Sequence, residues 1–180
     1  KVRPSPLFSR SSHLAGAVHR EEPFDDFARQ PLLPSKLSQL GPCMAWGDVD
    51  GDGDEDLFLG GARGEAGQIH LAEGDGSFSR REPAALLADA EAEDMGALFF
   101  DADSDGDLDL YVASGGVEKE PGHESYQDRL YLNDGQGQLI PAGDGVLPGD
   151  RTSSGPVAAA DIDRDGDLDL FVGGRVVPGK

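Results

Sequence analysis

The stretch DVDGDGDEDLFLG at residues 48–60 decides the fold of this chain, because it recurs as DADSDGDLDLYVA at 101–113 and as DIDRDGDLDLFVG at 161–173. Each copy opens with nine residues in which every odd position is Asp and the sixth is Gly. Five carboxylates this close together repel one another strongly unless a hard cation lies among them. Oxygen-rich loops of this spacing are how proteins bind calcium. The repeat therefore predicts three calcium sites.

The positions of the ligands follow from the way a tight turn wraps around one ion. Alternate side chains point inward, and an intervening backbone carbonyl supplies a further ligand. The sixth position, Gly53, Gly106 or Gly166, suits a backbone conformation that a Cβ would oppose. The predicted side-chain ligands are Asp48, Asp50, Asp52 and Asp56, then Asp101, Asp103, Asp105 and Asp109, then Asp161, Asp163, Asp165 and Asp169, and the predicted carbonyl ligands are those of Asp54, Asp107 and Asp167.

Position twelve distinguishes these loops from EF-hands. An EF-hand needs a bidentate Glu there and an amphipathic helix after it, whereas this chain has Leu59, Val112 and Val172. The apolar run after each loop predicts a strand buried on both faces. Acidic Asp-Gly runs also occur as solvated turns, but three copies in one register with the same exit strand favour a metal loop that joins two strands.

The composition indicates one all-β domain. The 180 residues include 26 Gly and 12 Pro, which favours many turns and few long helices. The formal charge is −20, but sixteen of the 35 acidic residues lie in the three loops. The basic residues are scattered singly, no run of eighteen apolar residues occurs, and Cys43 is the single cysteine. We therefore expect no nucleic-acid binding, no membrane insertion and no intrachain disulfide.

The loops belong to a longer repeat. Their starts lie 53 and 60 residues apart, a period typical of propeller blades or solenoid units. In each full period the loop lies between two apolar runs, and two further runs flank an Asp-Gly turn, so four antiparallel strands predict a β-propeller blade. The predicted units are 1–43, a preceding partial blade and inter-blade segment; 44–96 and 97–156, two complete blades with loops 48–56 and 101–109; and 157–180, the first half of a further blade with loop 161–169.

The loops with their exits DLFLGG, DLYVAS and DLFVGG resemble the FG-GAP and VCBS repeats of integrin-α-like β-propellers. The resemblance is nearest to secreted bacterial proteins with VCBS repeats, of the cartilage acidic protein type, and it covers about residues 41–174. It implies blades in which the calcium loop joins the first two strands, and a role in extracellular structure and recognition. It does not extend to integrin-type ligand binding, because the FG half of the motif is poorly matched.

Two complete blades and a half blade are too few for a closed ring, which typically needs four to eight blades. One hypothesis is a homodimer or higher ring in which two chains of three blades complete each other. Leu7-Phe8-Ser9-Arg10 would then supply an outer strand to the half blade, within one chain or between chains. The other hypothesis is that the chain is a fragment of a longer propeller.

Catalytic motifs in the sequence are weak. His123-Glu124 begins like a zinc-protease signature, but Gln127 stands where the second His is required. We therefore predict a non-enzymatic calcium-binding module for scaffolding, adhesion or recognition of an unknown protein or carbohydrate ligand. The alternative is the propeller part of a polysaccharide-active, lyase-like enzyme. Since millimolar calcium would fill such loops, we expect an extracellular, cell-surface or periplasmic location.

Overall fold

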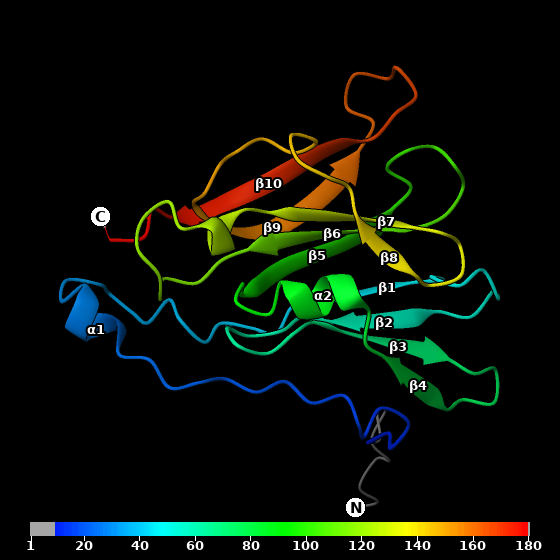
Figure 1. The fold of residues 1–180 in the computed structure, drawn as a ribbon, viewed down its shortest axis with the longest axis horizontal. Helices are drawn as coiled ribbons and strands as arrows, with labels where there is room; N and C mark the ends of the chain where they lie inside the picture. Colours follow the sequence, from blue (N-terminus) through cyan, green and yellow to red (C-terminus); the bar gives the residue numbers. More distant parts are fainter. Residues whose placement is uncertain (1–9, 180) are drawn as a thin grey trace, which may run out of the picture.

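The computed structural model describes residues 10–179, which form three antiparallel sheets with only short helices (Figure 1). The first sheet contains β1 (Met44–Gly47), β2 (Asp56–Leu59), β3 (Gln68–Ala72) and β4 (Phe78–Arg81). The second contains β5 (Asp94–Phe100), β6 (Asp109–Ser114), β7 (Arg129–Asn133) and β8 (Leu139–Pro141). The third contains β9 (Ser153–Ala160) and β10 (Asp169–Val176). The prediction of all-β architecture with four-stranded antiparallel units is confirmed.

The strands of each sheet pair in chain order, so each strand pairs with the next along the chain. The three acidic loops join β1 to β2, β5 to β6 and β9 to β10, and all three lie at the same end of the molecule (Figure 1). Strands β5 and β9 begin at Asp94 and Ser153, ahead of residues 97 and 157, where the sequence predicts them. The division of the chain into units at 1–43, 44–96, 97–156 and 157–180 stays a prediction.

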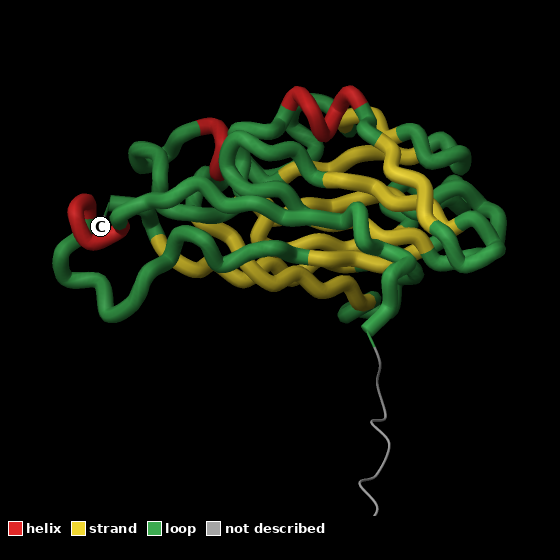
Figure 2. Tube along the Cα trace, turned by 90° about the horizontal axis from the view of Figure 1, so that it is seen from below, coloured by secondary structure: helices red, strands yellow, loops and turns green. Residues whose placement is uncertain are grey.

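The helices are short and lie at the periphery of the sheets (Figure 2). They are α1 (Asp26–Arg29), α2 (Ala84–Ala88) and the 3-10 helix at Glu124–Tyr126. Leu86 of α2 is buried in the core between the first two sheets, a contact that the sequence analysis does not anticipate. None of the described helices has the length and apolar character needed to cross a membrane.

Apolar side chains fill the space between neighbouring sheets, where β1 lies beside β5 and β5 beside β9. Phe58 on β2 and Leu110 on β6 are fully buried in the core between the first and second sheets. Tyr111 points to the opposite face of β6 and packs against Val157 and Leu170 of the third sheet. Because β2 and β6 are covered on both faces, every residue of these two strands is buried, as the apolar runs predict.

The N-terminal segment packs against the first sheet and its connections. Gln68 Nε2 donates a hydrogen bond of 2.9 Å to the carbonyl of Val18. His19 Nδ1 lies 3.0 Å from the carbonyl oxygen of Gly60, just after β2. Leu57 and Leu59, which alternate with Phe58 and therefore face away from the second sheet, are buried. The first sheet is thus covered on both faces at β2, whereas Met44 and Trp46 of β1 stay exposed.

The third sheet is covered on one face only, within the described residues. Phe171 on β10 occupies the position of Phe58 on β2, directly after the first residue of the exit run. Phe58 is 0% exposed, whereas Phe171 is 67% exposed. The difference follows from the packing, because Phe58 faces a neighbouring sheet and Phe171 faces solvent. The outer face of β9 and β10 is therefore an apolar surface without a neighbour among residues 10–179.

Candidate metal centres

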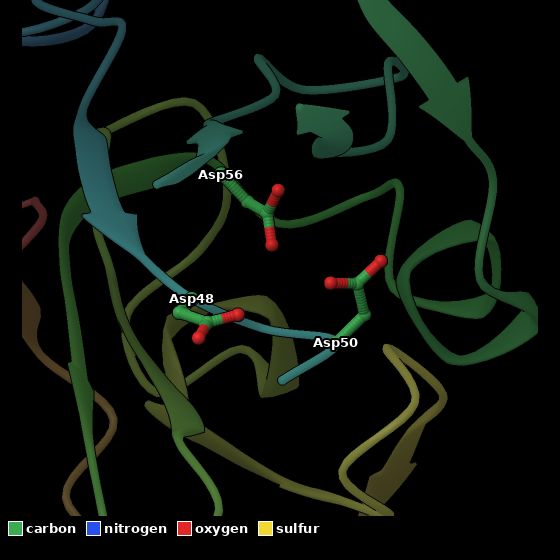
Figure 3. A group of neighbouring side chains, drawn as sticks. All are labelled: Asp48, Asp50 and Asp56. Atoms are coloured by element: carbon green, nitrogen blue, oxygen red, sulfur yellow. The ribbon is translucent and has the colours of Figure 1, made fainter. Parts of the chain in front are cut away.

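Each acidic loop brings three carboxylates together, from its first, third and ninth positions. The groups are Asp48, Asp50 and Asp56; Asp101, Asp103 and Asp109; and Asp161, Asp163 and Asp169, and within each group one oxygen per residue lies within 4.8 Å of the others. Figure 3 shows the carboxylates of the first group converging on a common space. The ninth Asp is buried in the first two groups, whereas all three residues of the third group are exposed.

The ninth Asp anchors the first loop to its sheet. Asp56 is fully buried at the start of β2. Its Oδ2 accepts a hydrogen bond of 2.8 Å from the N–H of Val49 in the loop. Its Oδ1 accepts one of 2.8 Å from the N–H of Ala72 at the end of β3. The carboxylate therefore fixes the loop against two strands while it contributes to the group.

The second loop has both hydrogen bonds of this anchor, and the third loop has one of them. Asp109 Oδ2 accepts the N–H of Ala102 at 2.8 Å, and Asp109 Oδ1 accepts that of Asn133 at 2.9 Å. Asp169 Oδ2 accepts the N–H of Ile162 at 3.0 Å. No third strand pairs with β10 in the described chain, so Asp169 Oδ1 lacks the second of these bonds. The first two loops are therefore held more firmly than the third.

The fifth Asp of each loop lies outside the three-carboxylate group. Asp52 Oδ1 accepts the N–H of Asp54 at 2.9 Å, and the fifth Asp of the other loops makes the same contact two residues on. Asp48 accepts the N–H groups of Asp52 and Gly53 at 3.1 and 3.0 Å. These bonds close the turn around the group. Coordination by the side chains of Asp52, Asp105 and Asp165 and by the carbonyls of Asp54, Asp107 and Asp167 stays a prediction.

The backbone of each loop enters the left-handed region twice. At the sixth position Gly53, Gly106 and Gly166 have φ of +93°, +97° and +103°, which confirms the conformation predicted there. The fourth position is also left-handed, and the sequence analysis misses it. Gly51 has φ of +74°, but Ser104 and Arg164 occupy the same position at +65° and +66°. Gly51 in the first loop is the one sequence signal for this left-handed conformation, because the other two loops have Ser104 and Arg164 at the fourth position.

The donor set of the loops fits a hard cation. Two buried oxygen atoms, Asp50 Oδ1 in the first group and Asp101 Oδ1 in the second, have no hydrogen-bond partner. Burial raises the pKa of Asp56 and Asp109, and the charges of neighbouring loop carboxylates raise it further. Buried carboxylate oxygens without a partner are costly, and oxygen-only groups of this kind suit Ca²⁺. The first, third and ninth residues of each loop are the ones placed to hold such an ion.

A buried amide links the first two loops, and the sequence analysis does not find it. Asn133, at the end of β7, donates from Nδ2 to the carbonyl of Val49 at 2.7 Å and to that of Leu108 at 3.1 Å. Val49 lies in the first loop and Leu108 in the second. Asn133 therefore joins loops from neighbouring sheets.

His123 and His70 have structural roles. His123 precedes the 3-10 helix, and its Nδ1 accepts the N–H of Ser125 at 3.2 Å as an N-cap. His70 is buried on β3 with Nε2 3.2 Å from Gln68 Oε1, and burial lowers its pKa. In the described residues, carboxylate, His and Cys side chains gather at metal-binding distance only in the three acidic loops.

The chain was compared with known protein families and with curated proteins. The search of curated proteins returned no match for this chain. Residues 48–112 and 121–172 match the family described as FG-GAP-like repeat. The two matched segments contain all three acidic loops and at least the start of each exit strand, and together they cover more than half of the chain. On its loops, its antiparallel four-stranded sheets and this match, the chain belongs to the FG-GAP-like repeat family.

Proposed function

We propose that the chain is a non-enzymatic, calcium-stabilised β-propeller module that serves as a scaffold for adhesion or ligand recognition. The observation that carries the proposal is the pair of buried, unpartnered oxygens, Asp50 Oδ1 and Asp101 Oδ1, within converging carboxylates of matched repeats. A cation placed there would coordinate these two oxygens, which accept no hydrogen bond. The ligand recognised is an unidentified protein or carbohydrate.

Calcium would act on the fold rather than on a substrate. In the metal-free chain the loop carboxylates repel one another, so binding energy becomes folding energy. With a dissociation constant of about 10 μM and about 1 mM free calcium, each site would contribute roughly 2.7 kcal/mol. Such concentrations occur outside the cytosol, which supports an extracellular, cell-surface or periplasmic location.

The third sheet supports assembly with further blades. Phe171 exposes apolar surface, and one edge of β10 exposes backbone groups, whereas the equivalent Phe58 is buried and the equivalent strands β2 and β6 are paired on both edges. A homodimer or higher ring, in which a second chain covers this face, would remove both exposures. Residues 7–9, which the sequence analysis suggests as an outer strand, lie outside the described part of the chain.

Thermal unfolding with light scattering, in calcium and in excess EGTA, tests the proposal. We expect the melting temperature to fall by roughly ten degrees or more in EGTA, since about 1 kcal/mol corresponds to a few degrees in a chain of this size. The matched variants Asp50→Asn and Asp103→Asn should each lose part of the calcium effect. Magnesium at equal concentration serves as the control for ionic strength. A melting temperature that does not respond to calcium would refute the metal role.

A further inference from the structure

The side chains of the three sheets follow one repeated pattern across the strand before each acidic loop and the strand after it. Residues directly opposite each other in an antiparallel pair lie on the same face of the sheet. The aromatic residue at the second position after each loop is opposite an apolar residue of the preceding strand, and these pairs are Ala45 with Phe58, Leu98 with Tyr111, and Ala158 with Phe171. We call this side of a sheet its leading face and the other side its trailing face.

Both junctions between sheets join a leading face to a trailing face. Phe58, on the leading face of the first sheet, shares a core with Phe99 and Leu110 of the second sheet. Phe99 and Leu110 are opposite each other and alternate with the leading pair of that sheet, so they lie on its trailing face. At the next junction Tyr111, on the leading face of the second sheet, packs against Leu170 on the trailing face of the third. In each case the leading face of one sheet covers the trailing face of the next.

Within residues 10–179 this order leaves one open face at each end of the stack of sheets. The first and third sheets lie on opposite sides of the second (Figure 1). The third sheet has an open leading face, where Phe171 is exposed together with Ala158 and Ala160. The first sheet has an open trailing face, where Met44 and Trp46 of β1 are 59% and 49% exposed. The two open faces are therefore the two halves of the junction that the chain forms twice internally.

The N-terminal segment covers only part of the trailing face of the first sheet. It lies against β3, where Gln68 bonds to the carbonyl of Val18, and it leaves the side chains of Met44 and Trp46 on β1 exposed. The ring of Trp46 extends across the face to Phe78 on β4, with ring centroids 6.3 Å apart at an edge-on angle of 72°. At the internal junctions β1 lies beside β5, and β5 beside β9. The exposed strand β1 is therefore the part of this face that a further sheet would contact.

We propose that the open leading face of the third sheet binds the open trailing face of the first sheet in a second copy of this chain, an inference that rests on the propeller module proposed above. Phe171 of one copy lies against Met44 and Trp46 of the other, as Phe58 lies against the second sheet. A second copy is the occupant that the pattern favours, because it presents the kind of face that covers a leading face at both internal junctions. Two third sheets in contact would join two leading faces, which neither internal junction does. Two copies joined by two head-to-tail contacts close a ring within the four to eight blades of known propellers.

The test is the mass in solution of the whole chain and of two charge variants, Phe171→Glu and Trp46→Glu, measured by light scattering in calcium. We expect the native chain to form a dimer or larger ring and each variant to be a monomer, because an unpaired charge is costly to bury in an apolar contact. Leu87→Glu is the matched control, since Leu87 is 51% exposed on α2, at an internal junction, and this variant should keep the native mass. A monomeric native chain whose melting temperature still rises in calcium would overturn the contact and leave the calcium-stabilised module intact.

A mixture of the two variants identifies which faces meet. Phe171→Glu keeps an intact trailing face and Trp46→Glu an intact leading face, so the equimolar mixture should form a dimer through one head-to-tail contact. One contact is weaker than two by roughly a hundredfold or more, so the mixture is measured at concentrations raised by more than that factor over the dissociation range of the native ring. A mixture that is still monomeric there would overturn the proposal. Dimerisation of Trp46→Glu alone would show that two third sheets meet, and dimerisation of Phe171→Glu alone that two first sheets meet; either result would also overturn it.

Discussion

Asn133 Nδ2 donates a hydrogen bond of 2.7 Å to the carbonyl of Val49, a residue 84 positions earlier in the acidic loop of the neighbouring sheet. The N–H of Val49 donates in turn to Asp56 Oδ2 at 2.8 Å. The peptide groups on both sides of Val49 are therefore fixed, between the ligand candidates Asp48 and Asp50. The second sheet thus holds the metal loop of the first.

Replacing Asn133 with Leu should loosen the first loop. The carbonyls of Val49 and Leu108 would lose a buried donor, so we expect a loss of about 1 to 3 kcal/mol in the free energy of unfolding by urea. Calcium affinity should fall at the first two loops and not at the third, which Asn133 does not contact. Gln136→Ala, in the exposed turn after β7, is the control. Equal affinities in Asn133→Leu and the native chain would contradict this coupling.

Glycine at the fourth loop position should stabilise the second and third loops. Ser104 and Arg164 adopt the left-handed conformation at a cost that Gly51 avoids. We expect Ser104→Gly to raise the free energy of unfolding by about 0.5 to 1 kcal/mol, and Gly51→Ala to lower it by about 1 kcal/mol. A Cβ on Gly51 has space, since its nearest neighbour would be Gly135 O at 3.5 Å. Denaturation in EGTA measures both, and destabilisation by Ser104→Gly would show that the serine has another role.

The ion pair between Asp94 on β5 and Arg129 on β7 lies within the second sheet, and Asp94 also bonds to the connection that follows β2 of the first sheet. Arg129 Nη2 lies 2.5 Å from Asp94 Oδ1, and Asp94 Oδ2 accepts the N–H of Gly61 at 2.7 Å. Removing one partner leaves a buried charge, so Arg129→Met should cost about 3 to 5 kcal/mol. The exposed pair of Arg80 and Glu82 is the control, and Arg80→Met should cost less than about 1 kcal/mol.

A double variant checks whether the buried charge is the cause. Asp94→Asn combined with Arg129→Met should recover part of the loss, because no charge is then left in the core. Additive losses in the double variant would mean that packing, not charge, accounts for the cost.

Substitutions at Phe58 and Phe171 should separate stability from assembly. Phe58→Ala removes a fully buried ring and should cost about 3 to 5 kcal/mol. Phe171→Ser changes a ring that is 67% exposed and should shift the free energy of unfolding by less than about 0.5 kcal/mol. If a second chain covers the third sheet, Phe171→Ser should dissociate the assembly in light scattering. An unchanged particle mass would place the contact elsewhere.

The stability of the metal-free chain should fall as pH rises. The pKa of Glu93 is raised by burial from 4.5 to about 8. A carboxyl whose folded pKa exceeds its unfolded value stabilises the fold fully below the unfolded pKa and loses that contribution as pH rises through the folded one. We therefore expect the free energy of unfolding in EGTA to fall by a few kcal/mol between about pH 5 and about pH 8. Glu93→Gln should flatten this slope and Glu91→Gln should not; an equal slope in all three would refute the assignment to Glu93.

The sequence predicts the local parts of this fold well. The run Leu57 to Leu59 follows its loop directly and is apolar throughout, so a strand covered on both faces is the simplest outcome, and β2 is one. The Asp-Gly turn at 134–135 likewise separates β7 from β8. In both cases residues close in the chain determine the structure. Helix α2 escapes prediction because its five residues carry no capping side chain and too few turns for a periodic pattern.

The contact that supports the candidate metal site from outside the loops joins residues that are far apart in the chain. Asn133 lies outside the acidic loops and bonds to Val49, which is 84 positions earlier in the chain. Nothing near Asn133 in the chain distinguishes it from an ordinary turn residue. Its role depends on the stacking of one sheet on the next, and no spacing rule within a repeat contains that information.

The bond from Asn133 to Val49 also has a consequence for the order in which the protein matures. The first loop belongs to one repeat, but the donor that fixes the carbonyl of its second residue belongs to the next repeat. A chain that emerges from the ribosome N-terminus first would therefore finish this loop one repeat late. Ala102, the counterpart of Val49 in the second loop, receives no such donor from residues 10–179. The first loop should therefore reach its full order, and its full calcium affinity, only after β7 has been translated.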